Sequence, residues 1–447
     1  MRLPTFRGGI HPPESKYLTE NKEIETLVPR GELVYPMSQH IGAPCAPIVK
    51  KGDRVLAGQK IADTGAFVSA PVMSSVSGTV KEIGNRMTIS GALETCVAVE
   101  SDGLFERAAP PRRKDFRKLK PAECIKIIRE AGLVGMGGAT FPTHVKLSPP
   151  PGKKIKWIIV NGAECEPFLN CDNRLMIEHP EPIIGGLEIC LHIFPEAKGI
   201  IAVENNKPEA IMRMSGELSK RRGKIGVIPH KVKYPQGAEK MLIYTVTGQE
   251  IPPGALPAEV GCLVLNVSTL AHIWYAVTDG VPVLDRVISV TGDAVVSPKN
   301  IIAPLGTSVR ELIDAAGGFS REPARILSGG PMMGISMRSI DVPIVKGTSG
   351  ILALSSKSAP TFEESNCVRC GRCIAACPMG LWPSALDRAA RLRQYSVFEQ
   401  NGGMNCVECG SCAYVCPSRR FLTQICRDGK AGVVAERKKQ KEGSAKR

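Results

Sequence analysis

Long apolar runs are missing from this sequence of 447 residues. The longest apolar stretches, such as residues 182–203, are interrupted by charged side chains, and none approaches the roughly 20 apolar residues that a membrane-spanning helix needs. The residues after Met1 also lack the apolar segment of a secretory signal peptide. We therefore expect a cytoplasmic chain that does not itself cross a membrane.

Aromatic residues are scarce, at 5% of the chain, although the formal net charge is +15. The basic residues are not interleaved with aromatic ones in a platform that could stack nucleic-acid bases, so nucleic acid is not an expected partner. Residues 427–447 hold eight Lys or Arg against three Asp or Glu. This basic tail fits a solvated, disordered segment, or one attracted to an anionic membrane surface or an acidic partner protein.

Eight of the sixteen cysteines form two runs with the same spacing, C-x2-C-x2-C-x3-C followed by proline. The first run is Cys367, Cys370, Cys373 and Cys377, and the second is Cys406, Cys409, Cys412 and Cys416. In bacterial ferredoxins with this spacing, the fourth cysteine of each run ligates the cluster of the other run. The sequence therefore predicts one 4Fe–4S cluster on Cys367, Cys370, Cys373 and Cys416, and a second on Cys406, Cys409, Cys412 and Cys377.

Zinc is the alternative occupant of these cysteines, because paired C-x2-C motifs also bind zinc. A zinc site needs four ligands and gives no reason for a triple spacing that twice ends in Cys-Pro, so iron–sulfur clusters are favoured. The other eight cysteines are scattered without a pairing rhythm. Thiolate ligands without an export signal indicate a reducing compartment. The chain is expected to carry electrons.

The N-terminal quarter is rich in turns and short β segments. Residues 1–30 predict an extended arm, and residues 32–100 contain short strands separated by Gly-Asp and Ala-Gly turns. With Ala70-Pro71, this segment resembles the hammerhead of biotinyl and lipoyl carrier domains. Those carriers present a lysine for modification, whereas residues 64–68 contain none. We expect the fold without the attached cofactor, serving as a docking module.

Alternating helical and strand patterns begin near residue 120, after a proline-rich linker at 110–114. They favour an α/β fold with a largely parallel sheet. A smaller β unit begins near residue 285 and includes a predicted helix over 308–316 that ends at a Gly-Gly pair. Three segments of the α/β region carry candidate ligand-binding residues.

The first segment is the glycine-rich loop 132–142, which contains Gly135, Gly137 and Gly138. Glycines permit backbone N–H groups to approach a phosphate or a flat ring closely, although they could also serve turns alone. The loop is not the dinucleotide fingerprint, because Thr140 occupies the position of its third glycine. Lys146 could add a fixed positive charge nearby.

Polar residues at the ends of two predicted strands form the other two segments. Asn161, Glu164 and Glu166 follow one apolar strand, and Asn266 and Thr269 follow another. Ligands bind at the carboxyl ends of parallel strands in open α/β sheets, and the amide of Asn161 suits a flavin or ribityl edge. An ordinary solvated loop is the alternative for the two carboxylates.

In this order, ahead of two cluster motifs, these segments resemble the flavin- and NADH-binding subunit of respiratory complex I. They are still more similar to the C subunits of Rnf-type membrane electron-transport complexes. The likeness covers nearly the whole chain and includes residues 5–13, the lysine-free hammerhead, and segments 161–167, 234–237 and 273–277. It implies a multidomain α/β fold: an arm and lipoyl-like hammerhead (1–115), a Rossmann-like flavin/NADH domain (116–284), an SLBB β-grasp domain (285–346), a ferredoxin-like double 4Fe–4S helical domain (347–426) and the basic tail (427–447).

The resemblance also implies the cofactor contacts. FMN would lie on Gly135, Gly137 and Gly138, with Asn161 and Glu164 near its ring and ribityl chain and with Asn266 and Thr269 at its phosphate. Phe141, Lys146 and Glu166 match contacts of the nicotinamide nucleotide, and Glu204 belongs to an acidic pair beside the site. Met136 and Ala163 depart from the complex I pattern, which has an arginine and an aspartate there. No side chain is expected to act as a general acid or base.

The implied function is electron transfer between ferredoxin and NAD(H) through FMN and two 4Fe–4S clusters, in a peripheral subunit on the cytoplasmic side of a membrane complex. Partner subunits in the membrane would couple this flow to Na+ or H+ translocation. A flavin suits this position because it exchanges electrons in pairs with a nicotinamide and singly with clusters. Two alternatives stay open: a soluble flavin/iron–sulfur reductase such as a cobalamin reductase, and a flavin-free electron-transfer scaffold.

Overall fold

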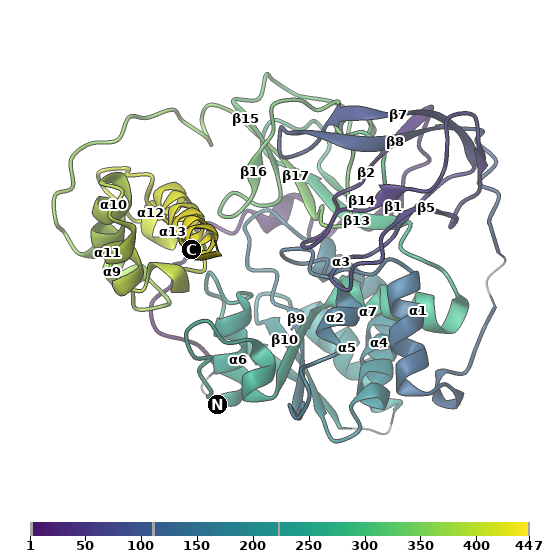
Figure 1. Cartoon of the computed structure of the whole chain (residues 1–447), viewed down its shortest axis with the longest axis horizontal. Helices are drawn as coiled ribbons and strands as arrows, with labels where there is room; N and C mark the ends of the chain where they lie inside the picture. Colours follow the sequence, from purple (N-terminus) through teal and green to yellow (C-terminus); the bar gives the residue numbers. More distant parts are fainter. Residues whose placement is uncertain (1–2, 110–111, 222–223, 446–447) are drawn as a thin grey trace.

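The computed structural model describes residues 3–109, 112–221 and 224–445, with side chains to residue 440. Pro110 and Pro111 of the predicted linker lie outside these residues. Figure 1 shows an α/β domain at the bottom of the view, two β-rich domains above it, and a helical domain on the left. Among the described residues, no helix is both long enough and apolar enough to span a bilayer.

Two small antiparallel sheets form the N-terminal hammerhead, and the β-rich prediction for this segment is confirmed. One sheet has the order β2-β8-β7-β4 and the other β3-β5-β6. The strands are β2 (Glu32–Pro36), β3 (Ala46–Pro47), β4 (Arg54–Val55), β5 (Lys60–Asp63), β6 (Val72–Met73), β7 (Gly78–Met87) and β8 (Leu93–Ser101). Leu33 and Tyr35 of β2 are buried while Val34 between them is less so, which is the alternation of a strand with one face in the core.

The α/β domain contains a four-stranded sheet of order β11-β10-β9-β12, and its strand pairs are all parallel, as predicted. The strands are β9 (Trp157–Gly162), β10 (Lys198–Glu204), β11 (Ile225–His230) and β12 (Cys262–Asn266). The helices are α1 (Pro121–Glu130), α2 (Thr143–Lys146), α3 (Cys171–Glu178), α4 (Pro180–Ile193), α5 (Pro208–Ser219), α6 (Glu239–Thr247) and α7 (Val267–Trp274), with the short η2 (Phe116–Lys118), η3 (Pro257–Val260) and η4 (Tyr275–Asp279). Ile158 and Val160 pack into one hydrophobic cluster and Ile159 into another, so both faces of the sheet are covered.

A six-stranded mixed sheet of order β1-β14-β13-β17-β15-β16 forms the β-grasp domain. Its strands are β1 (Ile24–Thr26), β13 (Asp285–Thr291), β14 (Lys299–Pro304), β15 (Arg325–Ser328), β16 (Ile335–Ser336) and β17 (Gly350–Leu354). Helix α8 (Val309–Ala315) begins where predicted, because Ser308 Oγ accepts a hydrogen bond from the backbone N–H of Glu311. The domain boundary expected after residue 346 precedes β17, so this sheet extends to Leu354 and also takes in β1 from the arm.

The C-terminal domain is helical, as expected of a ferredoxin-like unit. Its elements are α9 (Arg372–Ala376), α10 (Pro383–Arg391), α11 (Tyr395–Gln400), η5 (Gly403–Asn405), α12 (Ser411–Tyr414) and α13 (Leu422–Ala445). The prediction of a disordered tail is wrong for the described residues, because α13 continues past the predicted boundary between residues 426 and 427 to Ala445. Cys426 and Val433 of α13 are buried in one core with Leu386 and Phe398, and this packing stabilises the helix despite its charge.

The N-terminal arm joins the separate domains. A Cβ atom on Gly8 would lie 2.6 Å from the carbonyl oxygen of Cys377, so the arm passes the helical domain closely. The backbone N–H of Gly9 donates to Ala376 there, and Ile10 pairs with Tyr234 of the α/β domain. The arm then forms η1 (Lys16–Leu18) before β1 pairs with β14 of the β-grasp sheet. It therefore contacts three domains between Gly8 and Thr26.

Candidate functional site

The predicted strand-end residues meet at one edge of the parallel sheet. Asn161 of β9 and Asn266 of β12 are direct register partners, and Glu204 ends the neighbouring strand β10. Asn161 Nδ2 donates to the carbonyl oxygen of Gly237 at 2.9 Å, which fixes its amide at this edge. The carboxyl ends of three strands thus present polar side chains together, as in other open α/β sheets.

The glycine-rich loop lies against the start of α7. The backbone N–H of Met136 donates to Thr269 Oγ1 at 2.9 Å. A Cβ atom on Gly137 would lie only 2.5 Å from Asn266 Nδ2, whereas one on Gly138 would meet no described atom within 4 Å. The loop therefore needs glycine at residue 137 for close packing, and its exposed backbone at residue 138 is open to a ligand.

A buried arginine, which the sequence interpretation missed, stands at the same place. Arg286 is 1% exposed and donates through Nη1 to Ser268 Oγ, through Nη2 to the Met136 carbonyl (3.1 Å) and through Nε to the Thr348 carbonyl (3.2 Å). All three acceptors are neutral, so no hydrogen-bonded carboxylate compensates the guanidinium charge. Asn266 caps α7, whose N-terminal N–H groups carry a partial positive charge. Together these groups suit a phosphate.

Two carboxyl groups lie beside this positive region. Glu164 accepts hydrogen bonds from the backbone N–H groups of Asp172 (2.8 Å) and Asn173 (3.1 Å) at the start of α3. Asp172 in turn accepts from Asn266 Nδ2 at 2.6 Å. Burial, and then the charge of Glu164, raise the pKa of Asp172 to about 7. Sequence reasoning found Glu164 and missed Asp172, which lies inside a helix without a recognisable motif.

Two buried lysines hold the loop that follows β9. Lys16 of the arm donates through Nζ to the carbonyl oxygens of Glu164 (2.9 Å), Glu166 (3.1 Å) and Leu169 (2.5 Å). The side chain of Lys207 is 1% exposed, and its Nζ donates to the carbonyl oxygen of Ala163 in this loop at 2.7 Å. Burial, followed by repulsion from Lys207, lowers the pKa of Lys16. The backbone of this loop is thus fixed by cations from outside it.

Three more of the predicted site residues are Phe141 and Lys146, expected to contact the nucleotide, and Glu204, expected beside the site. Phe141 is half-buried in the glycine-rich loop. Lys146 Nζ pairs with Glu239 Oε1 at 2.8 Å and donates to the carbonyl oxygen of Val264 at 2.7 Å. Glu204 is buried with Lys207, whose Nζ lies 3.4 Å from its carboxylate, and burial raises the pKa of Glu204. The structure therefore gives Lys146 and Glu204 partners within the protein.

Glu166 joins the strand-end loop to the β-grasp domain. Its carboxylate accepts from the backbone N–H groups of Met332 (3.0 Å) and Met333 (2.8 Å), between β15 and β16. The hydroxyl of Tyr234 also approaches it, at 3.4 Å. Burial outweighs these hydrogen bonds and raises the pKa of Glu166 to about 6. A carboxylate offers about four lone-pair positions, so Glu166 can still accept a further donor.

The predicted second cluster set is assembled in the helical domain. Cys377, Cys406, Cys409 and Cys412 line one cavity, together with Thr423 and Cys426 of α13. The donor set fits a 4Fe–4S cluster, because four thiols from both runs converge on one apolar space. Cys367 and Cys370 of the other set are exposed at the surface. One predicted cluster site is therefore enclosed and the other faces solvent.

A small apolar junction connects the enclosed cluster site with the strand-end loop. Ile10, Tyr234, Ala376 and Cys409 form one buried cluster, and Cys165 packs against it. The Tyr234 hydroxyl donates to the carbonyl oxygen of Cys409 at 2.7 Å. Tyr234 thus contacts both the backbone of the cluster cysteine Cys409 and, through Glu166, the loop that follows β9.

Known proteins share this arrangement of domains. The chain is 47% identical over 386 residues to the C subunit of the proton-translocating ferredoxin:NAD(+) oxidoreductase complex of Clostridium ljungdahlii, covering 86% of this chain and 84% of that protein. It is 44% identical over 438 residues to the C subunit of the Na(+)-translocating ferredoxin:NAD(+) oxidoreductase complex of Acetobacterium woodii, covering 97% of this chain and 98% of that protein. The chain belongs to this family of C subunits.

Family models match each domain in turn. They are the RnfC barrel sandwich hybrid domain (residues 4–104), the Nuo51 FMN-binding domain (128–275), the SLBB domain (287–336) and the 4Fe-4S dicluster domain (366–421). The predicted membership of the C-subunit family, the fold class, and the FMN and iron–sulfur cofactors are therefore confirmed. The individual contacts to FMN and NADH stay predictions.

A solved structure shows the same fold at low identity. It is the air-oxidized NAD+-reducing [NiFe]-hydrogenase, with a TM-score of 0.50 at 18% identity over 71% of this chain and 61% of that chain. This likeness supports the fold of the chain and nothing about its substrates.

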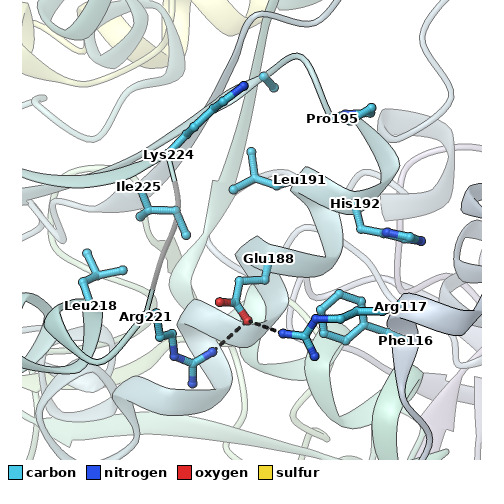
Figure 2. Close-up of a pocket in the computed structure, with 11 residues that line it drawn as sticks. Phe116, Arg117, Glu188, Leu191, His192, Pro195, Leu218, Arg221, Lys224 and Ile225 are labelled. Carbon is cyan, nitrogen blue, oxygen red and sulfur yellow. Dashed lines mark hydrogen bonds and ion pairs between the residues drawn. The ribbon is translucent and has the colours of Figure 1, made fainter.

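Figure 2 shows a cavity of about 400 Å³ elsewhere in the α/β domain. It lies at the edge where β10 and β11 begin, opposite the strand ends described above, and Lys224 and Ile225 help to line it. Glu188 points between two arginines, with Arg221 Nη1 at 2.8 Å and Arg117 Nη2 at 4.0 Å. The charges of Glu188, Arg221 and Arg117 are therefore paired. The cavity also lies at the edge of the sheet where the strands begin, whereas open α/β sheets bind ligands where the strands end.

Proposed function

We propose that this chain is a peripheral subunit of a membrane-bound, ion-translocating ferredoxin:NAD(+) oxidoreductase, on the cytoplasmic side of the membrane. It exchanges electrons between NAD(H), through FMN, and two 4Fe–4S clusters. Ferredoxin supplies or accepts these electrons directly or through a partner subunit, and the membrane subunits couple the flow to Na+ or H+ translocation. The family membership supports the assembly, and the domain content supports the redox chemistry.

The observation that carries the proposal is the junction at Tyr234. It places the enclosed cluster cavity against the loop that follows β9, which is the loop proposed to lie beside the flavin. Cys367 and Cys370 of the other cluster set are exposed, so that cluster would be accessible to a partner. A route for single electrons therefore runs from the edge of the α/β sheet, through a buried cluster, to one at the surface.

FMN is proposed to bind over the glycine-rich loop, with its phosphate at the start of α7. Gly135, Gly137 and Gly138 would offer backbone to the flavin, and Asn161 and Glu164 would border its ring and ribityl chain. Asn266 and Thr269, joined by Arg286, would hold the phosphate. When bound, FMN supplies the exchange between paired and single electrons.

The nicotinamide nucleotide is proposed to enter beside Phe141, Lys146 and Glu166, with Glu204 in the wall behind them. The free lone pairs of Glu166 can accept a hydrogen bond from the carboxamide of NADH. Lys146 can exchange its partly exposed ion pair with Glu239 for a nucleotide phosphate while it keeps its hydrogen bond to the carbonyl oxygen of Val264. These residues position the nucleotide, and none is required as a general acid or base.

Anaerobic purification with FMN and iron analysis tests the proposal. We expect about one FMN and eight iron atoms per chain, as two 4Fe–4S clusters require. Addition of NADH should bleach the flavin first and the cluster absorbance after it. A colourless protein with zinc on the eight cysteines would refute the redox function. Full cofactor content without recovery of membrane subunits on co-purification would instead indicate a soluble reductase.

A further inference from the structure

One face of α13 is turned toward the enclosed cluster site. Thr423, Cys426 and Lys430 recur at the i, i+3, i+7 spacing that places side chains on one side of a helix. Thr423 and Cys426 line the cavity formed by the four cluster cysteines. The face begins only a few residues after the second cysteine run, next to the segment whose charge had indicated a disordered tail.

The hydroxyl of Thr423 indicates that this site binds a ligand. Thr423 is 5% exposed, and its Oγ1 atom has no aligned hydrogen-bond partner among the residues that the structure describes. Thr423 lines the same cavity as the cluster cysteine Cys412. A buried hydroxyl without a partner costs free energy, so a partner is expected when the site is filled.

Cys426 lies beside another cluster cysteine. It is 1% exposed, Cys406 packs against the hydrophobic cluster that contains it, and both residues line the same cavity. One turn further along, Lys430 Nζ donates to the carbonyl oxygen of Cys406 at 2.6 Å and to Glu408 Oε1 at 2.7 Å. The helix therefore holds the backbone of Cys406 through Lys430 and places the Cys426 thiol in the cavity that Cys406 also lines.

We propose that Thr423 and Cys426 are positioning residues that raise the reduction potential of the enclosed cluster by donating hydrogen bonds to its cysteine sulfurs. The inference rests on the proposed function, since it requires a cluster on these cysteines. Reduction adds negative charge to the cluster and its ligands, and hydrogen-bond donors stabilise the reduced form. The exposed Cys367 and Cys370 do not line the cavity that these two residues enter, so the effect is confined to one cluster.

The decisive experiment is an EPR-monitored redox titration of the holoprotein. Thr423→Val keeps the shape and removes the hydroxyl, and Cys426→Ala removes the thiol. Each change should lower the equilibrium constant for one-electron reduction of one cluster by up to tenfold. This corresponds to a fall of about 59 mV in its reduction potential. The other cluster should keep its potential. Thr423→Ser and Cys426→Ser, which retain a donor, should restore most of the wild-type value.

Cys190→Ala is the matched control, because Cys190 is equally buried but lies in α4 of the α/β domain. Unchanged potentials of both clusters in the Thr423→Val, Cys426→Ala double variant, with full iron content, would overturn the proposal. Should Cys426→Ala lose iron, the comparison of Thr423→Val with Thr423→Ser decides alone. A wild-type protein without two EPR-active clusters would instead refute the proposed function.

Discussion

Replacement of Glu166 tests whether this carboxylate fastens the β-grasp domain to the strand-end loop. Its pKa rises from 4.5 to about 6, so the docked form binds the proton more tightly than the undocked form. The stabilisation is therefore complete below pH 4.5 and is lost as the pH rises through about 6. A shift of this size corresponds to about 2 kcal/mol. In Glu166→Gln, the pH dependence of docking should disappear.

Glu166→Ala removes the acceptor of two backbone N–H groups. Each lost hydrogen bond costs about 1–3 kcal/mol when the donor stays buried. Met333 is 45% exposed, so water can replace part of its bond, and we expect about 2 kcal/mol in total. Local opening would become about 30-fold more frequent, and the amides of Met332 and Met333 should exchange hydrogen about 30-fold faster. Peptide-resolved hydrogen exchange by mass spectrometry measures this directly.

Glu25→Ala provides the control, because Glu25 lies on β1 of the same sheet, 58% exposed in a surface ion pair with Lys299. That pair is worth little, and exchange near Met332 should not change. In Glu166→Gln, the KM for NADH should rise while iron and FMN contents stay at wild-type values. If Glu166→Ala raised that KM but left both amides protected, the docking role derived from the geometry would be refuted.

Three further substitutions test the cofactor sites. Gly137→Ala should lower the FMN content several-fold, because the new Cβ atom would lie 2.5 Å from Asn266 Nδ2. The fluorescence of released flavin measures the FMN content. Arg286→Lys keeps the charge but cannot reach all three acceptors, so the Kd for FMN should rise about tenfold in reconstitution titrations. An unchanged Kd would show that Arg286 does not belong to the phosphate site. Cys367→Ser should remove the exposed cluster alone, and iron analysis should fall from about eight to about four atoms per chain. Retention of all the iron would contradict the assignment of Cys367.

The features that the sequence predicted well depend on short spacings. Cys406, Cys409 and Cys412 share one cavity because their spacing fixes a tight local loop, and Cys377 joins them from the other run as the ferredoxin pattern predicts. The ends of β9 and β12 meet because parallel neighbours present their carboxyl ends at one edge. Asn161 and Asn266 could therefore be placed together without a structure. Helix α8 was also predicted correctly, since the cap at Ser308 is a local signal.

The missed features depend on contacts between distant residues. Tyr234 and Cys409 are 175 residues apart, and Lys16 is 148 residues from Glu164. No periodicity relates such pairs, so only the packed domains bring them together. Helix α13 was missed for another reason: its charge indicated disorder, whereas the apolar spacing of Cys426 and Val433 indicates a packed face.

The crossing of the arm has a consequence for biosynthesis. The residues of the arm have their final partners at Tyr234, at β14 and at Ala376, all of which are translated much later than the arm. The arm therefore stays without these partners until most of the given chain has been translated, although domains generally fold in order from the amino end. Docking of the arm therefore requires that the α/β, β-grasp and helical domains have already folded, so we expect it to be a late step in the folding of this chain.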